Sequence, residues 1–322
     1  MELRFHYPDP RRRLAGVRLA HELRDRLPRE FTRDGHKWEL CAPAPKVTRF
    51  EYQLELIDRR GHSEWVLDAT NPRRASGPWG DKSVWEAPEY ERPTWLDAKP
   101  VGSSEATMIS SRILRTSLHA ILWAHPNANE RSPLLVVHDG PEYAEHSALL
   151  TLLGQLPPLR AVLLAPVERN EIYSASARYA RALVDEILPS VGQAPARIGM
   201  GASLGALAML HAHRRYPESF DALFLQSGSF FRRHDHHERR FPRFERISRF
   251  VGATLAGSYG RPVPVTIVCG TVDENLPANE AMMAALQRQH YDVRFHAFRD
   301  GHNWVAWRNS FHPHLLDLLQ RL

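Results

Sequence analysis

Alternating apolar and polar residues predict β-structure near the start of the chain. Residues 50–56 (FEYQLEL) alternate in this way, which is typical of a half-buried strand. The turn sequence at residues 58–61 and the apolar run at residues 65–67 complete a predicted hairpin. Frequent proline and glycine between residues 71 and 88 argue against a helix there. We therefore predict a small antiparallel β-sandwich over residues 38–95.

The residues before this sandwich are polar and rich in arginine. Leu19, Leu23 and Leu27 recur at helical spacing among charged residues, which predicts one short surface helix in a polar lead-in. A segment with proline, glycine and serine, residues 93–105, marks a boundary. The sequence thus predicts an N-terminal domain over residues 1–100, made of the lead-in and the sandwich.

Beyond residue 100, short apolar runs alternate with longer helix-like stretches. The later apolar runs are rich in Val, Ile and Leu and flanked by Gly or Pro, which is typical of parallel strands buried on both faces. The predicted strands are 113–114, 120–124, 134–138, 161–166, 198–202, 223–227, 263–269 and 293–298. The predicted helices are 175–188, 204–215, 279–290 and 305–322. This order predicts an α/β domain over residues 101–322.

Composition narrows the class of protein. A chain of 322 residues is long for one hydrophobic core and favours about two domains. Its 42 basic and 37 acidic residues give a net charge of +5 that is spread along the chain, whereas nucleic-acid binders usually gather basic residues in a patch. We find no apolar run near the roughly 20 residues that cross a bilayer, and no secretory signal. Cys41 and Cys269 are too few for a disulfide framework or a cysteine-built zinc site, so we expect a cytoplasmic protein.

The strongest local motif is G-x-S-x-G within residues 198–207 (IGMGASLGAL). An apolar strand runs into the motif and a helix-forming run follows, which is the context of a nucleophile elbow. Gly201 and Gly205 allow the strand and the helix to approach closely, while Ser203 occupies a strained turn. The alternative is a tight strand-to-helix turn that merely contains a serine. In this context we predict that Ser203 is a nucleophile.

A serine nucleophile needs a base, and an acid that orients the base. His302 lies after the last predicted strand, in the chain order serine, acid, histidine of α/β-hydrolases. His138, which ends an earlier strand, is a minor rival. Asp273 follows a strand and a glycine turn and is the favoured acid, while the adjacent Glu274 remains open and Asp300 is a residual candidate.

Oxyanion stabilisation requires two N–H groups aimed at the tetrahedral intermediate. One is expected from Leu204, the residue after the nucleophile, and the other from the loop after strand 134–138. This loop contains Gly140, Pro141 and Glu142.

These motifs together resemble the esterase D (putative esterase) family, and the whole chain is similar to the enterochelin esterases and their relatives. The matching segments are 135–143, 169–171, 186–189, 199–205, 226–229, 269–273 and 301–308, with 68–72 and 77–83 in the N-terminal part. The resemblance implies an α/β-hydrolase domain preceded by an all-β, immunoglobulin-like (early-set) sandwich. It also implies a serine carboxylic ester hydrolase that forms an acyl-enzyme, needs no metal or organic cofactor, and acts on a small-molecule ester, with a siderophore-type ester as the leading substrate.

Two departures from the family pattern concern the site. Pro141 stands where several relatives place an N–H donor, so the donor must shift to Gly140 or Glu142. Asn303 stands where an aspartate is frequent.

The resemblance also suggests substrate-binding residues. Arg169 and Glu171 are expected in the acyl or catecholate pocket, with a surface salt-bridge loop as the alternative, and Tyr143 is a further candidate. The run of Arg and His at residues 232–240 suggests an anion or chelate site, although a solvated excursion is the simpler interpretation, and no acid or cysteine pattern supports a metal there.

Two other functions remain open at this stage. One is acyl transfer by the same triad, and the other is a catalytically silent binding or scaffold protein. The expected partner is a small-molecule ester, with no nucleic acid and no membrane, and the sequence leaves a homo-oligomer open.

Overall fold

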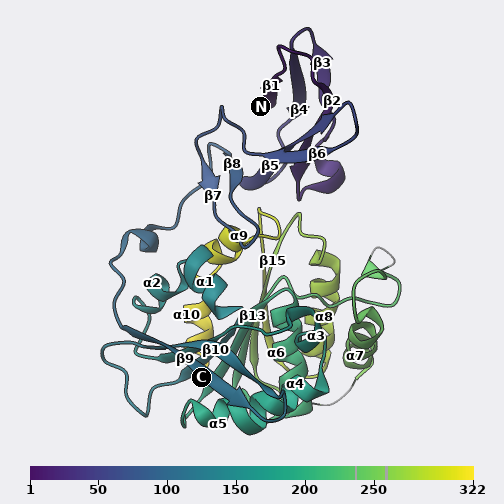
Figure 1. The fold of residues 1–322 in the computed structure, drawn as a ribbon. Coiled ribbons are helices and arrows are strands. Elements are labelled where there is room, and N and C mark those ends of the chain that lie inside the picture. Colours follow the sequence, from purple (N-terminus) through teal and green to yellow (C-terminus); the bar gives the residue numbers. More distant parts are fainter. Residues whose placement is uncertain (236–237, 258–259) are drawn as a thin grey trace. The chain divides into compact units, whose positions relative to one another are not determined.

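The computed structural model describes residues 1–235, 238–257 and 260–322 (Figure 1). Two compact units divide the chain. The first contains residues 1–91 together with the loop residues 271–273 and 299–303, and the second contains the rest. Within the described ranges, no helix combines the length and the hydrophobicity that a membrane crossing requires.

The first unit contains two antiparallel sheets. One has the strand order β1 (Glu2–Pro8), β4 (Lys37–Pro43), β3 (Thr32–Asp34). The other has the order β2 (Leu14–His21), β5 (Arg49–Asp58), β8 (Lys82–Glu86), β7 (Arg74–Ala75), and β6 (Ser63–Val66) also pairs with β5. Apolar side chains from both sheets form one shared core. The predicted N-terminal all-β structure is therefore confirmed.

The predicted polar lead-in with a surface helix is wrong. Residues 1–37 contribute β1, β2, β3 and the start of β4, and η1 (Arg24–Arg26) is a single 3₁₀ turn. Leu19, Leu23 and Leu27 are at most 1% exposed. Leu19 is an inward residue of β2, whereas Leu23 and Leu27 flank η1, so the three buried side chains come from a strand and a turn and not from one helix. The exposed arginines occupy outward positions between inward apolar residues, as Arg18 does in β2.

The second unit is built on an eight-stranded sheet with the order β16-β15-β14-β13-β11-β12-β10-β9. Strands β11 to β16 pair in parallel, while β9 and β10 form an antiparallel hairpin at one edge. The strands are β9 (Ser103–Ser111), β10 (Thr116–Ala124), β11 (Leu134–His138), β12 (Arg160–Leu164), β13 (Arg197–Ala202), β14 (Ala222–Gln226), β15 (Pro264–Gly270) and β16 (Asp292–Phe298).

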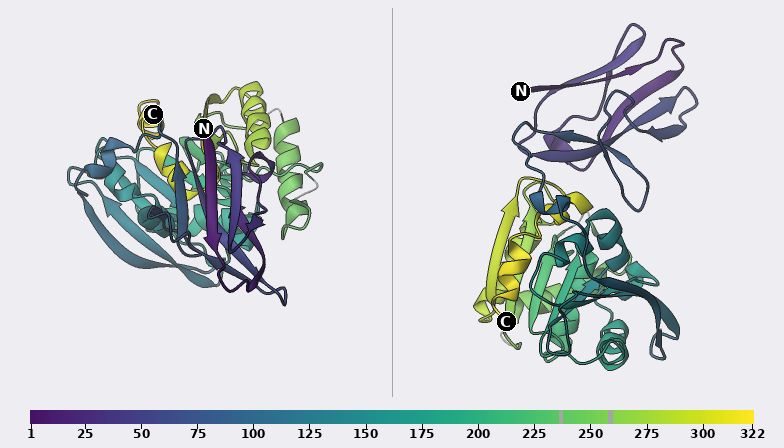
Figure 2. Two further views of the ribbon diagram at one scale, coloured as in Figure 1. Left: turned by 90° about the horizontal axis from the view of Figure 1, so that it is seen from above. Right: turned by 90° about the vertical axis from the view of Figure 1, so that its left-hand side faces the viewer.

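Helices cover both faces of this sheet (Figures 1 and 2). Along β11, Val136 joins a core with residues of α6 and α8, whereas Leu135 and Val137 join a core with residues of α1 and α10. The helical elements are η2 (Thr94–Asp97), α1 (Gly140–His146), α2 (Leu149–Leu153), α3 (Arg169–Ile172), α4 (Ala177–Ala182), η3 (Leu183–Ile187), α5 (Leu188–Ser190), α6 (Leu204–Arg215), α7 (Phe244–Ala256), α8 (Leu276–Arg288), α9 (Trp304–Asn309) and α10 (His314–Leu319). The predicted α/β domain is confirmed.

Two predicted elements of this unit differ from the structure. Residues 112–115 form the turn of the β9–β10 hairpin and not a strand, and β9 itself was missed because most of its residues are polar and exposed. The predicted helix 305–322 is divided into α9 and α10.

Candidate active site

Ser203 lies in the turn between β13 and α6, at the N-cap of the helix. Its backbone has φ 55° and ψ −120°, which an L-residue adopts only at a cost of about 1–3 kcal/mol. A Cβ at Gly201 would lie 2.5 Å from the carbonyl carbon of Gly205. The strand and the helix therefore approach as closely as predicted, and glycine at position 201 is required for it.

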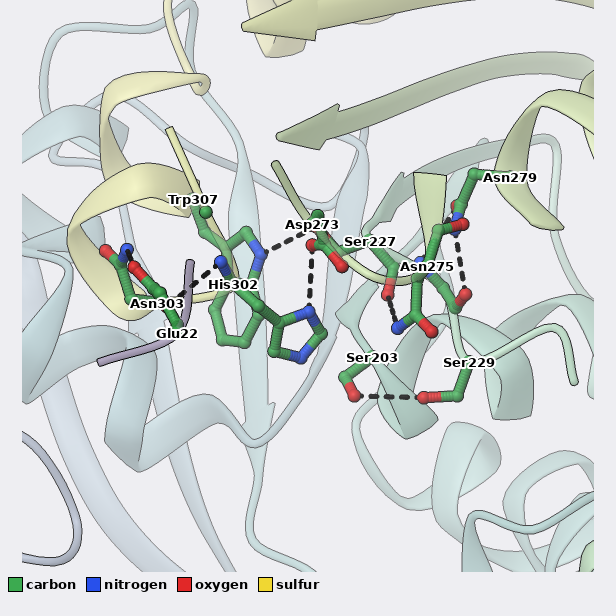
Figure 3. Close-up of polar contacts among 12 residues, drawn as sticks. Glu22, Ser203, Ser227, Ser229, Asp273, Asn275, Asn279, His302, Asn303 and Trp307 are labelled. Carbon is green, nitrogen blue, oxygen red and sulfur yellow. Dashed lines mark hydrogen bonds and ion pairs between the residues drawn. The ribbon is translucent and has the colours of Figure 1, made fainter. Parts of the chain in front are cut away.

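Polar contacts hold the backbone and hydroxyl of Ser203. Its N–H donates to the carbonyl of Gln226 over 2.8 Å, and its Oγ lies 3.0 Å from Oγ of Ser229 (Figure 3). The N–H of Ser229 in turn donates to the carbonyl of Ser203. Ser229 was not predicted as a site residue, and its place in the family-like run 226–229 is the only sequence signal that points to it.

His302 and Asp273 form a hydrogen-bonded pair. The Nδ1 of His302 lies 2.9 Å from Oδ2 of Asp273, whose side chain is 0% exposed (Figure 3). Both residues belong to the first compact unit. A carboxylate on Nδ1 fixes the tautomer in which Nε2 accepts a proton, as a general base requires. Of the acids that the sequence left open, the geometry favours Asp273.

Asp300, the residual acid candidate, is engaged elsewhere. Its Oδ1 accepts from the N–H of Gly301 over 2.7 Å and from Nδ2 of Asn303 over 3.1 Å. Burial raises the pKa of Asp300 to about 6, against the opposing effect of Arg49.

His138, the rival base, is fully buried and satisfied on both ring nitrogens. Nδ1 lies 3.0 Å from the carbonyl of Gly205, and Nε2 lies 2.8 Å from the hydroxyl of Tyr179. Burial lowers the pKa of His138 to about 3. These contacts assign His138 to packing against the first turn of α6.

The oxyanion candidates lie at the starts of two helices. Leu204 is the first residue of α6, and Gly140 and Glu142 lie in the first turn of α1. N–H groups of a first helical turn have no acceptor within the helix. A Cβ at Gly140 would lie 2.3 Å from Cβ of Leu163, so close packing on β12 requires the glycine.

Arg169 forms an ion pair with Asp139, the residue that precedes α1. Its Nε and Nη2 donate to the two carboxylate oxygens of Asp139 over 2.8 and 2.7 Å, and Asp139 is 2% exposed. Such a two-pronged pair fixes geometry as well as charge. Arg169 therefore positions the segment that carries Gly140.

The other two candidate substrate-binding residues have partners within the protein. Glu171 accepts from Nε of Arg243 over 2.5 Å and from Nη1 of Arg246 over 2.8 Å. Tyr143 is 0% exposed, and its hydroxyl donates to Oε1 of Gln226 over 2.6 Å. This burial gives Tyr143 a packing role and argues against direct contact with a substrate.

An arginine-rich cleft lies in the second unit. It has a volume of about 1020 Å³ and is lined by Arg233, Arg239, Phe241, Arg243, Phe244, Glu245, Arg246 and Arg249. His236 and His237, from the predicted anion-binding run, lie outside the described residues. Within those described, no three His, Cys, Asp or Glu side chains are grouped so as to hold a metal ion.

Comparisons with known proteins agree with this architecture. Residues 164–318 match the model of the family described as "Putative esterase". The chain is 25% identical over 304 residues to the iron(III) enterobactin esterase of an Escherichia coli O6:H1 strain, covering 87% of this chain and 73% of that protein.

Two solved structures have folds similar to that of this chain. The enterobactin esterase of Shigella flexneri superposes with a TM-score of 0.80 at 21% identity, over 99% of this chain and 93% of that one. A fluorophosphonate-binding serine hydrolase of Staphylococcus aureus superposes with a TM-score of 0.51 at 12% identity, over 66% and 96%. The predicted α/β-hydrolase fold and the resemblance to enterochelin esterases are confirmed. The chain is an esterase similar to the enterobactin esterases, and its residues 164–318 match the putative esterase family.

Proposed function

We propose that the chain hydrolyses a carboxylic ester through a Ser203, His302, Asp273 triad. Ser203 Oγ attacks the ester carbonyl carbon while Nε2 of His302 takes the hydroxyl proton. The tetrahedral intermediate then expels the alcohol, which receives that proton from His302, and leaves an acyl-enzyme. Water attacks the acyl-enzyme by the same sequence and releases the acid.

The strained turn at Ser203 is the observation that carries this proposal. A non-glycine residue at φ 55° and ψ −120° persists only where the surroundings enforce it, and such strain gathers at active sites. The positions of Asp273 and His302 along the chain support their roles as acid and base. Ser203, Asp273 and His302 follow the ends of the parallel strands β13, β15 and β16 by one, three and four residues. Open α/β sheets bind ligands outside these carboxyl ends.

For the oxyanion we propose the N–H of Leu204 and one N–H from the first turn of α1. Pro141 has no N–H, so Gly140 and Glu142 are the donors that this turn offers. The ion pair between Arg169 and Asp139 supports the role, because it fixes the residue that precedes Gly140.

We propose an aromatic, anionic ester of the siderophore type as the substrate. The enterobactin esterases among the relatives suggest this class. The five arginines of the cleft favour an anionic ligand, and Glu171 pairs with two of them, Arg243 and Arg246. Assays of siderophore, feruloyl and glycerol esters on one preparation test the choice. The siderophore ester should give the highest kcat/KM, and its advantage should shrink as salt screens the arginines. A salt-independent preference for a neutral ester would contradict the proposal.

We also propose a cytoplasmic location. Cys41 and Cys269 are not joined by a disulfide, which suits a reducing compartment.

A fluorophosphonate probe and p-nitrophenyl butyrate test the chemistry directly. The wild-type protein should be labelled on Ser203 and should hydrolyse the ester, and Ser203→Ala should do neither. Ser110→Ala is the matched control, because it removes an exposed hydroxyl on β9 that has no contact with Ser203, and it should be labelled and active like the wild type. Labelling that survives in Ser203→Ala would contradict the proposed nucleophile.

A further inference from the structure

The loop that carries His302 is held by residues of the N-terminal β-structure. Residues 299–303 cluster with residues 1–91 in one compact unit. The N–H and Oγ1 of Thr48 both donate to the carbonyl of Arg299, over 2.8 and 2.9 Å. Glu22, which follows β2, accepts from the N–H of His302 over 3.2 Å (Figure 3). The backbone of the proposed base is thus bonded to a side chain 280 residues earlier in the chain.

The carboxyl group of Glu22 lies beside Gly301, in space that a side chain at position 301 would occupy. A Cβ at Gly301 would lie 2.6 Å from both Cδ and Oε1 of Glu22. Because these atoms are held by hydrogen bonds, the side chain has little freedom to move away. The glycine before His302 is therefore required for the contact with Glu22.

Asn303 links Glu22 to Asp300 by donating a hydrogen bond to each carboxyl group. Its Nδ2 donates to Oε1 of Glu22 over 2.8 Å and to Oδ1 of Asp300 over 3.1 Å (Figure 3). Its Oδ1 accepts from Nη1 of Arg49 over 3.3 Å. An ionised aspartate has no donor, so at this position it would remove the hydrogen bonds that Asn303 donates and add a negative charge beside Asp300. Asparagine at position 303 therefore suits the presence of Glu22, whereas an ionised aspartate would not.

Several ionisable side chains surround Glu22 and Asn303, and acids outnumber bases among them. Arg49, which is 2% exposed, pairs with Glu51 over 3.0 Å, and Lys82 lies 3.4 Å from the other oxygen of Glu51. Burial, together with the Glu51 and Asp300 carboxylates, raises the pKa of Glu22 to about 8. Burying the Glu22 carboxyl group beside other carboxyl groups lowers the stability of the fold. A role in positioning His302 explains why the chain has an acid there.

We propose that Glu22 and Asn303 are a matched pair through which the N-terminal β-structure positions the catalytic base His302. This inference rests on the proposed function, in which His302 is the base. Glu22 fixes the backbone of His302 while Asp273 fixes its ring, so the two acids together determine where Nε2 points. Glu22 and Asn303 are positioning residues.

Four variants test the pair: Glu22→Gln, Asn303→Asp, the double variant, and Glu30→Gln as control. Glu30 is an exposed acid paired with Arg18 in the same unit. Each single change at the pair should lower kcat for p-nitrophenyl butyrate by about 10- to 100-fold with KM unchanged, since small misplacements of catalytic groups have effects of this size. In the double variant the new amide at position 22 donates to the new carboxylate at position 303, and the amide oxygen accepts from the N–H of His302, so kcat should recover. The control should match the wild type.

The pH profile separates positioning from general destabilisation. Asn303→Asp adds a carboxylate near His302, which should move the acid limb of kcat/KM to higher pH, whereas partial unfolding would lower the plateau and leave the limb in place. A wild-type kcat in Glu22→Gln, or a double variant as impaired as the product of the singles, would overturn the pairing. If Glu22→Gln does not fold, a wild-type kcat and acid limb in Asn303→Asp would do so instead.

His302→Ala separates this inference from the proposed function. An active His302→Ala would end both. An inactive His302→Ala beside a fully active Glu22→Gln would end only the positioning role of Glu22.

Discussion

Gly201→Ala is a demanding test of the strained turn, because the added methyl group meets only backbone. The new Cβ would lie 2.5 Å from the carbonyl carbon of Gly205, 2.7 Å from its oxygen and 2.9 Å from the N–H nitrogen of Ala206. Carbon atoms in contact ordinarily lie about 3.5–4.0 Å apart. The first turn of α6 must therefore move by roughly 1 Å, and Ser203 and Leu204 must move with it.

The expected loss of stability follows from this overlap. Overpacking of this kind costs about 1–3 kcal/mol, only partly offset by the roughly 0.4–1 kcal/mol that alanine gains by restricting the unfolded chain. The effect on activity should be larger, since a shift of about 1 Å in catalytic groups lowers the rate by about 100-fold. Urea unfolding and kcat for p-nitrophenyl butyrate measure the two effects.

Gly252→Ala is the matched control for this change. Gly252 lies within α7, and a Cβ there meets nothing within 4 Å. Alanine should stabilise the helix by up to about 1 kcal/mol and leave kcat unchanged. If Gly201→Ala behaved like Gly252→Ala in both measurements, the close approach of β13 and α6 would be refuted.

Three further predictions concern the acids around the site. Asp273→Asn should lower kcat by about 10⁴-fold through the wrong tautomer of His302, whereas Glu274→Gln should have little effect, and the reverse ranking in steady-state assays would contradict the assignment. Arg169→Met leaves the buried Asp139 without its guanidinium, but Arg169 is 37% exposed and solvent screens the pair, so the variant should cost about 1–3 kcal/mol in urea unfolding; a loss below about 0.5 kcal/mol would contradict the positioning role of this pair. Because the pKa of Glu22 rises from 4.5 to about 8 on folding, the folded protein binds more protons in that interval and the contribution of Glu22 to stability falls as the pH rises. The unfolding midpoint of Glu22→Gln should therefore fall less than that of the wild type between about pH 5 and pH 8, and equal falls would contradict the titration.

The strand-to-helix turn at Ser203 was predictable because its signal is local. Residues 198–207 combine an apolar strand, the two glycines of the G-x-S-x-G motif and a helix-forming run, so all of these signals lie within ten residues of the chain. The structure adds the backbone angles of Ser203 and the atoms that exclude a Cβ at Gly201. Chain order favoured His302 and Asp273 but left Glu274 open, and the structure pairs His302 with Asp273.

The contacts that the sequence did not reveal join residues far apart in the chain. Glu22 is one acid in a charged segment, and nothing near it indicates that its carboxyl group meets His302 and Asn303. Ser229 was missed for a similar reason, because its role depends on the neighbouring strand β14 ending beside Ser203. The strands of residues 1–37 were missed because the leucine spacing suggested one helix, whereas Leu19 lies in β2 and Leu23 and Leu27 flank η1.

A double-mutant cycle measures most directly whether Ser203 and His302 act as one catalytic unit, on which the proposed function depends. The kcat/KM of wild type, Ser203→Ala, His302→Ala and the double variant is determined with one activated ester. We expect that each single change removes nearly all of the activity and that the double variant is no worse than either, as for residues that share one step. Losses that multiply in the double variant would mean that the two side chains act independently.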